Sequence, residues 1–187
     1  MHTSQMKIYR ILAVVAIIAA LAMTLIVHPA AAKSTRIDFE NYNIACSILS
    51  EKVWVSDDGV VHIRDRVYNS VVTSTSDYHA GQGYIYGNAN ITDPAAGIGA
   101  YFGSLDIYPT AHPDGYWYGK WSMRITATGY HGIARLKGYG SLKGMRSFAS
   151  LTPLPPDVLA GFSGLCGGSQ PKAGTYVVGY ILLPGDD

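Results

Sequence analysis

The side chains best suited to acid–base chemistry after residue 33 are three carboxylates and one imidazole, Asp65, Asp106, Asp114 and His131. None of them belongs to a motif that identifies an enzyme. The chain has neither a G-x-S-x-G nucleophile elbow nor an H-E-x-x-H zinc helix. Because distance along the chain does not predict proximity in space, the sequence identifies no catalytic residue and predicts no cofactor.

Cys46 and Cys166 are the two cysteines of the chain, and an exported domain is where such a pair persists as a disulfide. The bridge would close a loop of about 120 residues, worth roughly 4 to 5 kcal/mol of stability on the chain-entropy model. The alternative is two separate buried thiols, since the sequence does not show whether the Cα atoms are within bonding range. A metal site is not expected, because zinc ligands usually come in close pairs. The histidines of residues 33–187 lie singly, at His62, His79, His112 and His131.

The first 32 residues have the layout of an export signal. Lys7 and Arg10 precede an apolar run of 17 residues, Ile11 to Val27, and the small residues Ala30 and Ala32 follow it. This layout predicts cleavage near residue 32. The alternative is an uncleaved membrane anchor, because the run exceeds a usual signal core yet is slightly shorter than a span of about 20 residues. In both cases residues 33–187 form one extracytoplasmic domain, secreted or anchored in the cytoplasmic membrane by residues 11–27.

Composition narrows the class of that domain. Residues 33–187 carry 12 basic and 13 acidic residues, a net charge of −1, which argues against a strongly basic nucleic-acid binder. All 21 glycines lie in this part, and together with the many aromatic residues they argue against a helical bundle. A single β-rich domain is the remaining expectation.

Apolar and polar residues alternate with a period of two in several segments, which is typical of half-buried strands. In 117–127 the apolar side chains lie at odd positions, and in 133–144 the charged ones do. Val61, Ile63 and Val67 alternate in the same way with polar neighbours. Candidate strands number eight or nine, at about 37–49, 52–56, 60–73, 78–92, 98–108, 116–128, 131–142, 144–151 and 174–183.

No amphipathic helix is available to cover a sheet of this size, so the sheet would bury its apolar side by closing on itself or by splitting into two layers. We favour the first arrangement, and the predicted fold is all-β, an antiparallel closed barrel of eight or nine strands. Glycines recur as G-x-G-x-x-x-G in three trios with even spacing, which we interpret as lumen-facing bends of this barrel. The trios are Gly81, Gly83 and Gly87; Gly97, Gly99 and Gly103; and Gly138, Gly140 and Gly144.

The segment from Gly81 through residues 93–99, then Trp117–Trp121 and residues 138–145, resembles a group of uncharacterised secreted bacterial proteins. More distantly it is similar to the allene oxide cyclase and dirigent barrels. The resemblance covers roughly residues 80–150 and implies an eight-stranded barrel. It transfers no activity, because no catalytic residue of the plant enzymes maps onto a matching motif here.

Three aromatic residues on apolar faces are the candidate ligand-binding residues: Trp117, Trp121 and Tyr101. They would line a barrel cavity that holds a small apolar molecule. The alternative is simple core packing, since aromatic residues dominate small barrel cores whether or not they bind a ligand.

Two further features concern surface partners of the domain and the segment that would cover one end of the barrel. Residues 115–156 contain six basic side chains and no acidic one, which could form a patch for an anionic surface partner or could be an ordinary solvated face. The proline- and glycine-rich stretch from Leu151 to Gly174 is long for a connection within a domain. If Cys166 pairs with Cys46, we expect this stretch to cap one end of the barrel.

Taken together, the sequence predicts an exported, non-catalytic β-barrel domain that binds a small apolar ligand or a cell-surface partner. One alternative is a cyclase- or isomerase-like enzyme that uses a barrel cavity. The other is a structural or interaction module whose core is filled. These three possibilities differ in whether the barrel lumen is open or filled by side chains, which the sequence does not show.

Overall fold

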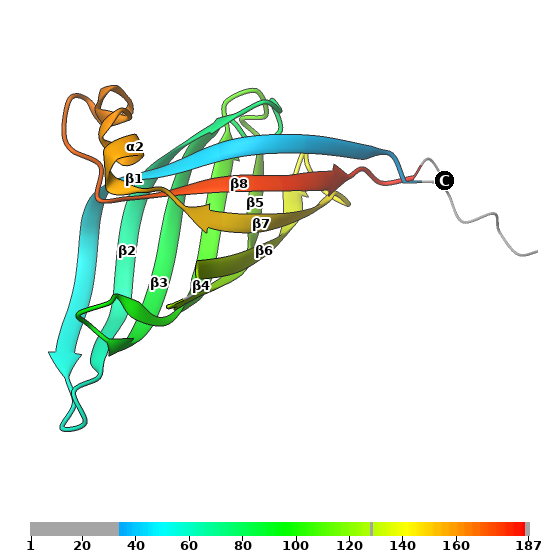
Figure 1. The fold of residues 1–187 in the computed structure, drawn as a ribbon. Coiled ribbons are helices and arrows are strands. Elements are labelled where there is room, and N and C mark those ends of the chain that lie inside the picture. Colours follow the sequence, from blue (N-terminus) through cyan, green and yellow to red (C-terminus); the bar gives the residue numbers. More distant parts are fainter. Residues whose placement is uncertain (1–33, 128, 186–187) are drawn as a thin grey trace, which may run out of the picture. The chain divides into compact units, whose positions relative to one another are not determined.

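The computed structural model describes residues 34–127 and 129–185. Eight strands close into one antiparallel barrel, each pairing with its neighbours in chain order and β8 pairing with β1, as Figure 1 shows. The predicted all-β closed barrel is confirmed, with eight strands. They are β1 (Arg36–Val55), β2 (Val61–Ser74), β3 (Gly81–Asp93), β4 (Ile98–Pro109), β5 (Gly115–Thr126), β6 (Gly129–Gly140), β7 (Arg146–Pro153) and β8 (Ala173–Leu182).

The predicted signal or anchor segment, residues 1–32, lies outside the described residues. Within the part of the chain that the structure describes, no helix combines the length and the apolar character needed to span a membrane.

The first strand joins two segments that the sequence analysis treated as separate, 37–49 and 52–56. β1 is continuous over 20 residues, and its pairing with β2 is interrupted where Cys46 and Leu49 have no partner across the ladder. Such bulges bend a strand without ending it. β1 accordingly curves along its length towards the β1–β2 hairpin (Figure 1). The two predicted segments are therefore parts of one bent strand, and the barrel has eight strands, not nine.

Another bulge lies in β2 and changes which side chains face the lumen. Ile63 pairs with Ala89 and Arg66 pairs with Gly87, so β2 holds one residue more than β3 over this stretch. Asp65 within it has a φ of 53°, in the left-handed region that non-glycine residues seldom occupy. The predicted alternation that put Val67 on the face of Ile63 is therefore wrong beyond Asp65. Val67 pairs with exposed Tyr86 on the outer face, and Arg66 and Tyr68 turn inward instead.

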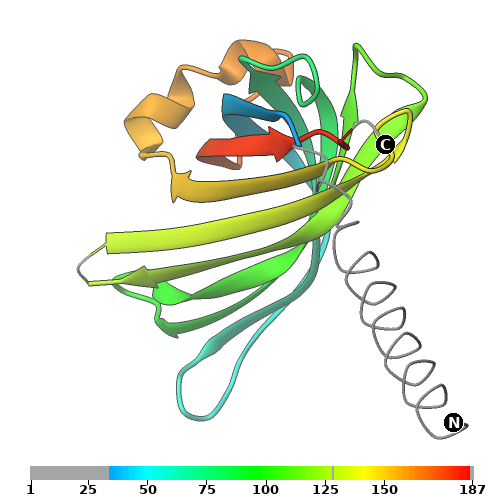
Figure 2. The same ribbon diagram turned by 90° about the vertical axis from the view of Figure 1, so that its right-hand side faces the viewer.

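The connection between β7 and β8 contains helix α2 (Pro156–Ala160) and the short 3-10 helix η1 (Ser163–Cys166). The rings of Tyr42 and Phe162 lie 5.0 Å apart, and Tyr42 is on the outer face of β1. Cys166 in η1 forms the predicted disulfide with Cys46, which confirms the pairing. The expectation of a cap over the barrel end is wrong, because the connection lies against the outside of β1. Figure 2 shows α2 and η1 beside β1 and β8.

The glycine trios divide into two structural roles. Gly81, Gly83 and Gly87 all lie in β3 on the lumen side, as the even spacing predicts. Gly140 and Gly144 instead belong to the tight connection between β6 and β7, where their φ angles are +62° and +90°. These left-handed values suit glycine. The third trio is therefore mainly a turn device rather than a strand bend.

Candidate ligand-binding site

The barrel lumen has a filled end and a hollow end. The filled end lies beneath the β2–β3, β4–β5 and β6–β7 connections, where Trp117, Leu142 and Ile181 have no exposed surface. Trp117 Nε1 donates a hydrogen bond of 2.7 Å to the carbonyl oxygen of Tyr78 in the β2–β3 connection. Side chains therefore close this end of the barrel.

His79 lies in the filled end between two aromatic rings. Its ring centroid is 4.2 Å from that of Phe39 and 5.0 Å from that of Trp117. Neither ring nitrogen has a hydrogen-bond partner among the described residues. Burial lowers the pKa of His79 to about 3, so the imidazole is neutral at physiological pH. It acts as a core side chain at this position.

The hollow end is a cavity of about 250 Å³ near the β3–β4 and β5–β6 hairpins. Its apolar wall comes from lumen-facing positions of β3, β4, β5, β7 and β8, which include Ile85, Leu105, Met123, Ile125, Leu151 and Val177. Four residues, among them Leu105 and Leu151, also border a smaller void of about 30 Å³ deeper in the lumen. The cavity therefore tapers towards the filled end.

Two of the three predicted site residues line this cavity. Trp121 and Tyr101 lie on its wall, on β5 and β4. Trp121 Nε1 donates a hydrogen bond of 3.2 Å to the carbonyl oxygen of Ser104, which orients the indole ring. Trp117 does not border the cavity, although it lies on the same face of β5. It is packed in the filled end, so the core-packing interpretation holds for Trp117.

Asn43 is a polar residue of the cavity wall that the sequence analysis missed. It lies on β1 and borders both the cavity and the deeper void. Its Oδ1 atom is buried and accepts no hydrogen bond from the described residues. A buried acceptor without a donor costs free energy, and a ligand hydroxyl or N–H group could supply that donor. The signal that could have identified Asn43 is its place on the same strand face as the apolar residues Phe39 and Ala45.

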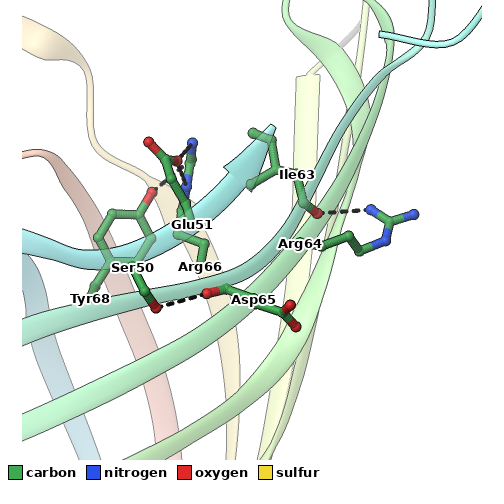
Figure 3. A network of polar contacts seen from close by, with 7 residues as sticks. All are labelled: Ser50, Glu51, Ile63, Arg64, Asp65, Arg66 and Tyr68. Carbon is green, nitrogen blue, oxygen red and sulfur yellow. Dashed lines mark hydrogen bonds and ion pairs between the residues drawn. The ribbon is translucent and has the colours of Figure 1, made fainter. Parts of the chain in front are cut away.

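A polar cluster lies beside the cavity, at the inward-turned part of β2 (Figure 3). Arg66 Nη1 donates a hydrogen bond of 3.0 Å to Tyr68 Oη, and Arg66 Nε donates one of 2.7 Å to Glu51 Oε2. Tyr68 borders the cavity. The bulge at Asp65 is held by Ser50 Oγ, which donates a hydrogen bond of 3.0 Å to the Asp65 carbonyl oxygen. The bulge thus places a guanidinium–carboxylate pair next to an apolar cavity.

Tyr101 is neutral in this setting. Burial raises the pKa of its phenol, and the nearby charge of Arg66 opposes that rise in part. Tyr101 is therefore a phenol that can donate or accept a hydrogen bond, and the hydroxyl of Tyr68 already accepts one from Arg66 Nη1. The described wall of the cavity offers these two phenols, the Asn43 carboxamide and the Thr175 hydroxyl as polar groups.

The four side chains first considered for acid–base chemistry do not converge. Asp65 pairs with Lys52 in the β2 bulge, and His131 is on the outer face of β6 opposite Arg124. Asp106 is on the outer face of β4, where burial raises the pKa of its carboxyl group. Asp114 lies in the β4–β5 connection, and its carbonyl oxygen accepts a hydrogen bond from the Ser141 backbone. These four residues therefore form no common site.

No protein-family model matches the chain, and no curated protein matches it. Among solved structures the chain is similar to a pterocarpan synthase dirigent protein, with 10% sequence identity and a TM-score of 0.46. The similarity covers 82% of this chain and 97% of that chain. No functional residue is transferred from it, and the resemblance to secreted bacterial proteins stays a prediction.

Proposed function

We propose that this chain is an exported, non-catalytic binding domain that holds one small apolar molecule in the hollow end of its barrel. The observation that carries the proposal is the apolar cavity of about 250 Å³ with the buried, unpartnered Oδ1 of Asn43 in its wall. Eight-stranded barrels are wide enough to hold one small ligand. The Cys46–Cys166 disulfide is compatible with an extracytoplasmic location.

The dimensions and chemistry of the cavity indicate the class of ligand. An apolar cavity of about 150 Å³ holds a benzene ring, so this one suits a molecule of one or two rings or a short branched chain. Trp121 and Met123 provide polarizable contacts, and Asn43 favours a ligand that carries a hydroxyl or N–H donor. The ligand class is therefore a small aromatic or terpene-like alcohol or phenol.

The experiment compares 2-naphthol with naphthalene, which have the same ring system but differ in one hydroxyl. Isothermal titration calorimetry on the purified protein should show 2-naphthol binding about tenfold more tightly, since one good hydrogen bond to a buried acceptor is worth about 1.4 kcal/mol. Asn43→Leu should remove this preference and keep naphthalene binding. The variant also removes an unpartnered polar group, so its stability should not fall.

Two variants in which an alanine is replaced by phenylalanine locate the binding site. Ala173 borders the cavity on β8, whereas Ala100 is exposed on the outer face of β4. Ala173→Phe should abolish the binding of both probes, and Ala100→Phe should leave it unchanged. Unchanged binding by Ala173→Phe would refute the proposed site. The alternative of a cyclase- or isomerase-like enzyme would be favoured instead if a bound polyene left the protein as a rearranged product.

A further inference from the structure

The outer face of β5, β6 and β7 carries basic side chains directly opposite one another. Lys120 on β5 pairs in register with Arg135 on β6, and Lys137 on β6 pairs with Arg146 on β7. These four belong to the acid-free stretch 115–156. The strand register therefore gathers cations that are spread over 27 positions of the chain into two adjacent cross-strand pairs.

These cations have no carboxylate partner in the described part of the chain. Among the described residues, the cations that form ion pairs are Arg36, Lys52 and Arg66. Lys120 lies over the ring of Tyr118, at 5.8 Å from its centroid. Like charges directly opposite one another on neighbouring strands destabilise a sheet. Stability therefore does not account for the two pairs, whereas an anionic partner would.

A groove of about 610 Å³ begins at Arg135 and crosses the outer face of β6, β7, β8 and β1, four strands that lie side by side in Figure 1. Phe148 and Tyr180 lie in it with their rings stacked at 5.4 Å, and Arg36 lies 4.2 Å above the Tyr180 ring. The carboxylates of Asp38 and Glu40 and the hydroxyls of Thr75 and Ser150 complete its polar lining. Four strands spaced by about 4.8 Å make this groove about 15 Å across.

We propose that this groove and the adjacent cationic pairs bind an acidic polysaccharide. Aromatic side chains provide apolar surface for the faces of sugar rings, and Asp38, Glu40 and Ser150 can bond to sugar hydroxyls. Lys120, Arg135, Lys137 and Arg146 neutralise the acid groups of the polymer where it leaves the groove. This site is on the outside of the barrel and is independent of the cavity described above.

Two features of the groove favour a glycan over other anionic partners. The groove is concave, whereas a lipid bilayer presents a broad flat surface. Asp38 and Glu40 would repel a nucleic-acid backbone, which carries a negative charge on every nucleotide. A polysaccharide has many neutral hydroxyls between its acid groups, so it can place these hydroxyls against the two carboxylates.

The test uses polygalacturonate as the acidic probe, dextran as the neutral probe and phosphatidylglycerol vesicles as the lipid probe. Affinity electrophoresis and calorimetry on the purified protein should show binding to polygalacturonate that weakens with added salt. Lys120→Gln/Arg135→Gln should lower this affinity about tenfold, equivalent to about 1.4 kcal/mol. Its thermal midpoint should stay equal or rise, because a like-charge pair is removed. The matched control is Lys172→Gln, an exposed cation outside the patch, which should bind as the parent protein does.

Tyr180→Leu removes one aromatic ring of the groove without a change of charge and should also weaken polygalacturonate binding. Equal affinity for dextran, binding to vesicles alone, or unchanged affinity in the Lys120/Arg135 variant would each overturn the proposal. So would burial of this face in a self-associated form that excludes polygalacturonate. Ligand-filled and empty barrels should bind polygalacturonate equally, so failure here does not affect the proposal for the cavity.

Discussion

Gly87 on β3 lies under the indole ring of Trp121 on β5, two strands away around the barrel. A Cβ atom at position 87 would lie 3.3 Å from Trp121 Cζ2, which is tighter than ordinary van der Waals contact. The missing side chain therefore leaves room for the largest ring of the cavity wall.

Replacement of Gly87 should change the cavity more than the stability of the fold. Gly87→Ala should displace the Trp121 ring by a few tenths of an ångström and weaken 2-naphthol binding, with an unfolding free energy within about 1 kcal/mol of the parent. Gly87→Val should cost about 1–3 kcal/mol, because it overpacks the lumen. Urea denaturation measures the unfolding free energy, and tryptophan fluorescence measures the binding of 2-naphthol. Gly164→Ala is the control, since a Cβ there meets no atom within 4 Å; equal effects at both positions would contradict the prediction.

His79 should make the fold sensitive to acid. Its folded-state pKa of about 3 lies below the unfolded value of 6.5, so the unfolded chain binds more protons between these two pH values. The contribution of His79 to stability is therefore complete above pH 6.5 and is lost as the pH falls towards 3, by up to about 1.4 kcal/mol per pH unit. Urea midpoints measured at several pH values in this window should fall less steeply for His79→Leu than for the parent.

His131→Gln is the control for that experiment, because His131 is exposed on the outer face of β6. Its urea midpoints should follow those of the parent protein across the same window. If His79→Leu also follows the parent, the buried imidazole is not the source of the acid sensitivity.

Asp65 should show the cost of a left-handed backbone in the β2 bulge. Asp65→Gly and Asp65→Ala both remove the ion pair with Lys52, so their difference reports the backbone alone. With a φ of 53°, the glycine variant should be more stable than the alanine variant by about 1 kcal/mol. Urea denaturation of the two variants measures this difference. Equal midpoints would show that residue 65 takes another conformation in solution.

The Cys46–Cys166 bridge joins residues 120 positions apart and fixes η1 to the outer face of β1. Cys46→Ser/Cys166→Ser should lower the unfolding free energy by about 2–5 kcal/mol. It should also make residues 154–172 sensitive to protease. Binding of 2-naphthol should persist, because none of these residues is among the described residues that border the cavity. Reduction of the parent protein should have the same effects. Loss of ligand binding in the variant would show instead that the bridge supports the cavity wall.

The sequence by itself was sufficient for much of the architecture. The period-two pattern and the turn residues located the strands, and the lack of an amphipathic helix favoured a closed sheet. The even cysteine count indicated the bridge. These inferences succeeded because they depend on local backbone preferences and on the need to bury one apolar face, both of which are written in short stretches of chain.

The tertiary structure alone decided which residues surround the cavity. Trp117 and Trp121 lie on the same face of the same strand, and strand parity cannot distinguish them. Trp117 is covered by Tyr78 and His79 from a distant connection, whereas Trp121 faces the open lumen. The bulge at Asp65 likewise reverses the parity of β2 and turns Arg66 inward. Both outcomes depend on non-local packing and register between strands, because a strand's own sequence shows which residues share a face but not what the rest of the chain places against it.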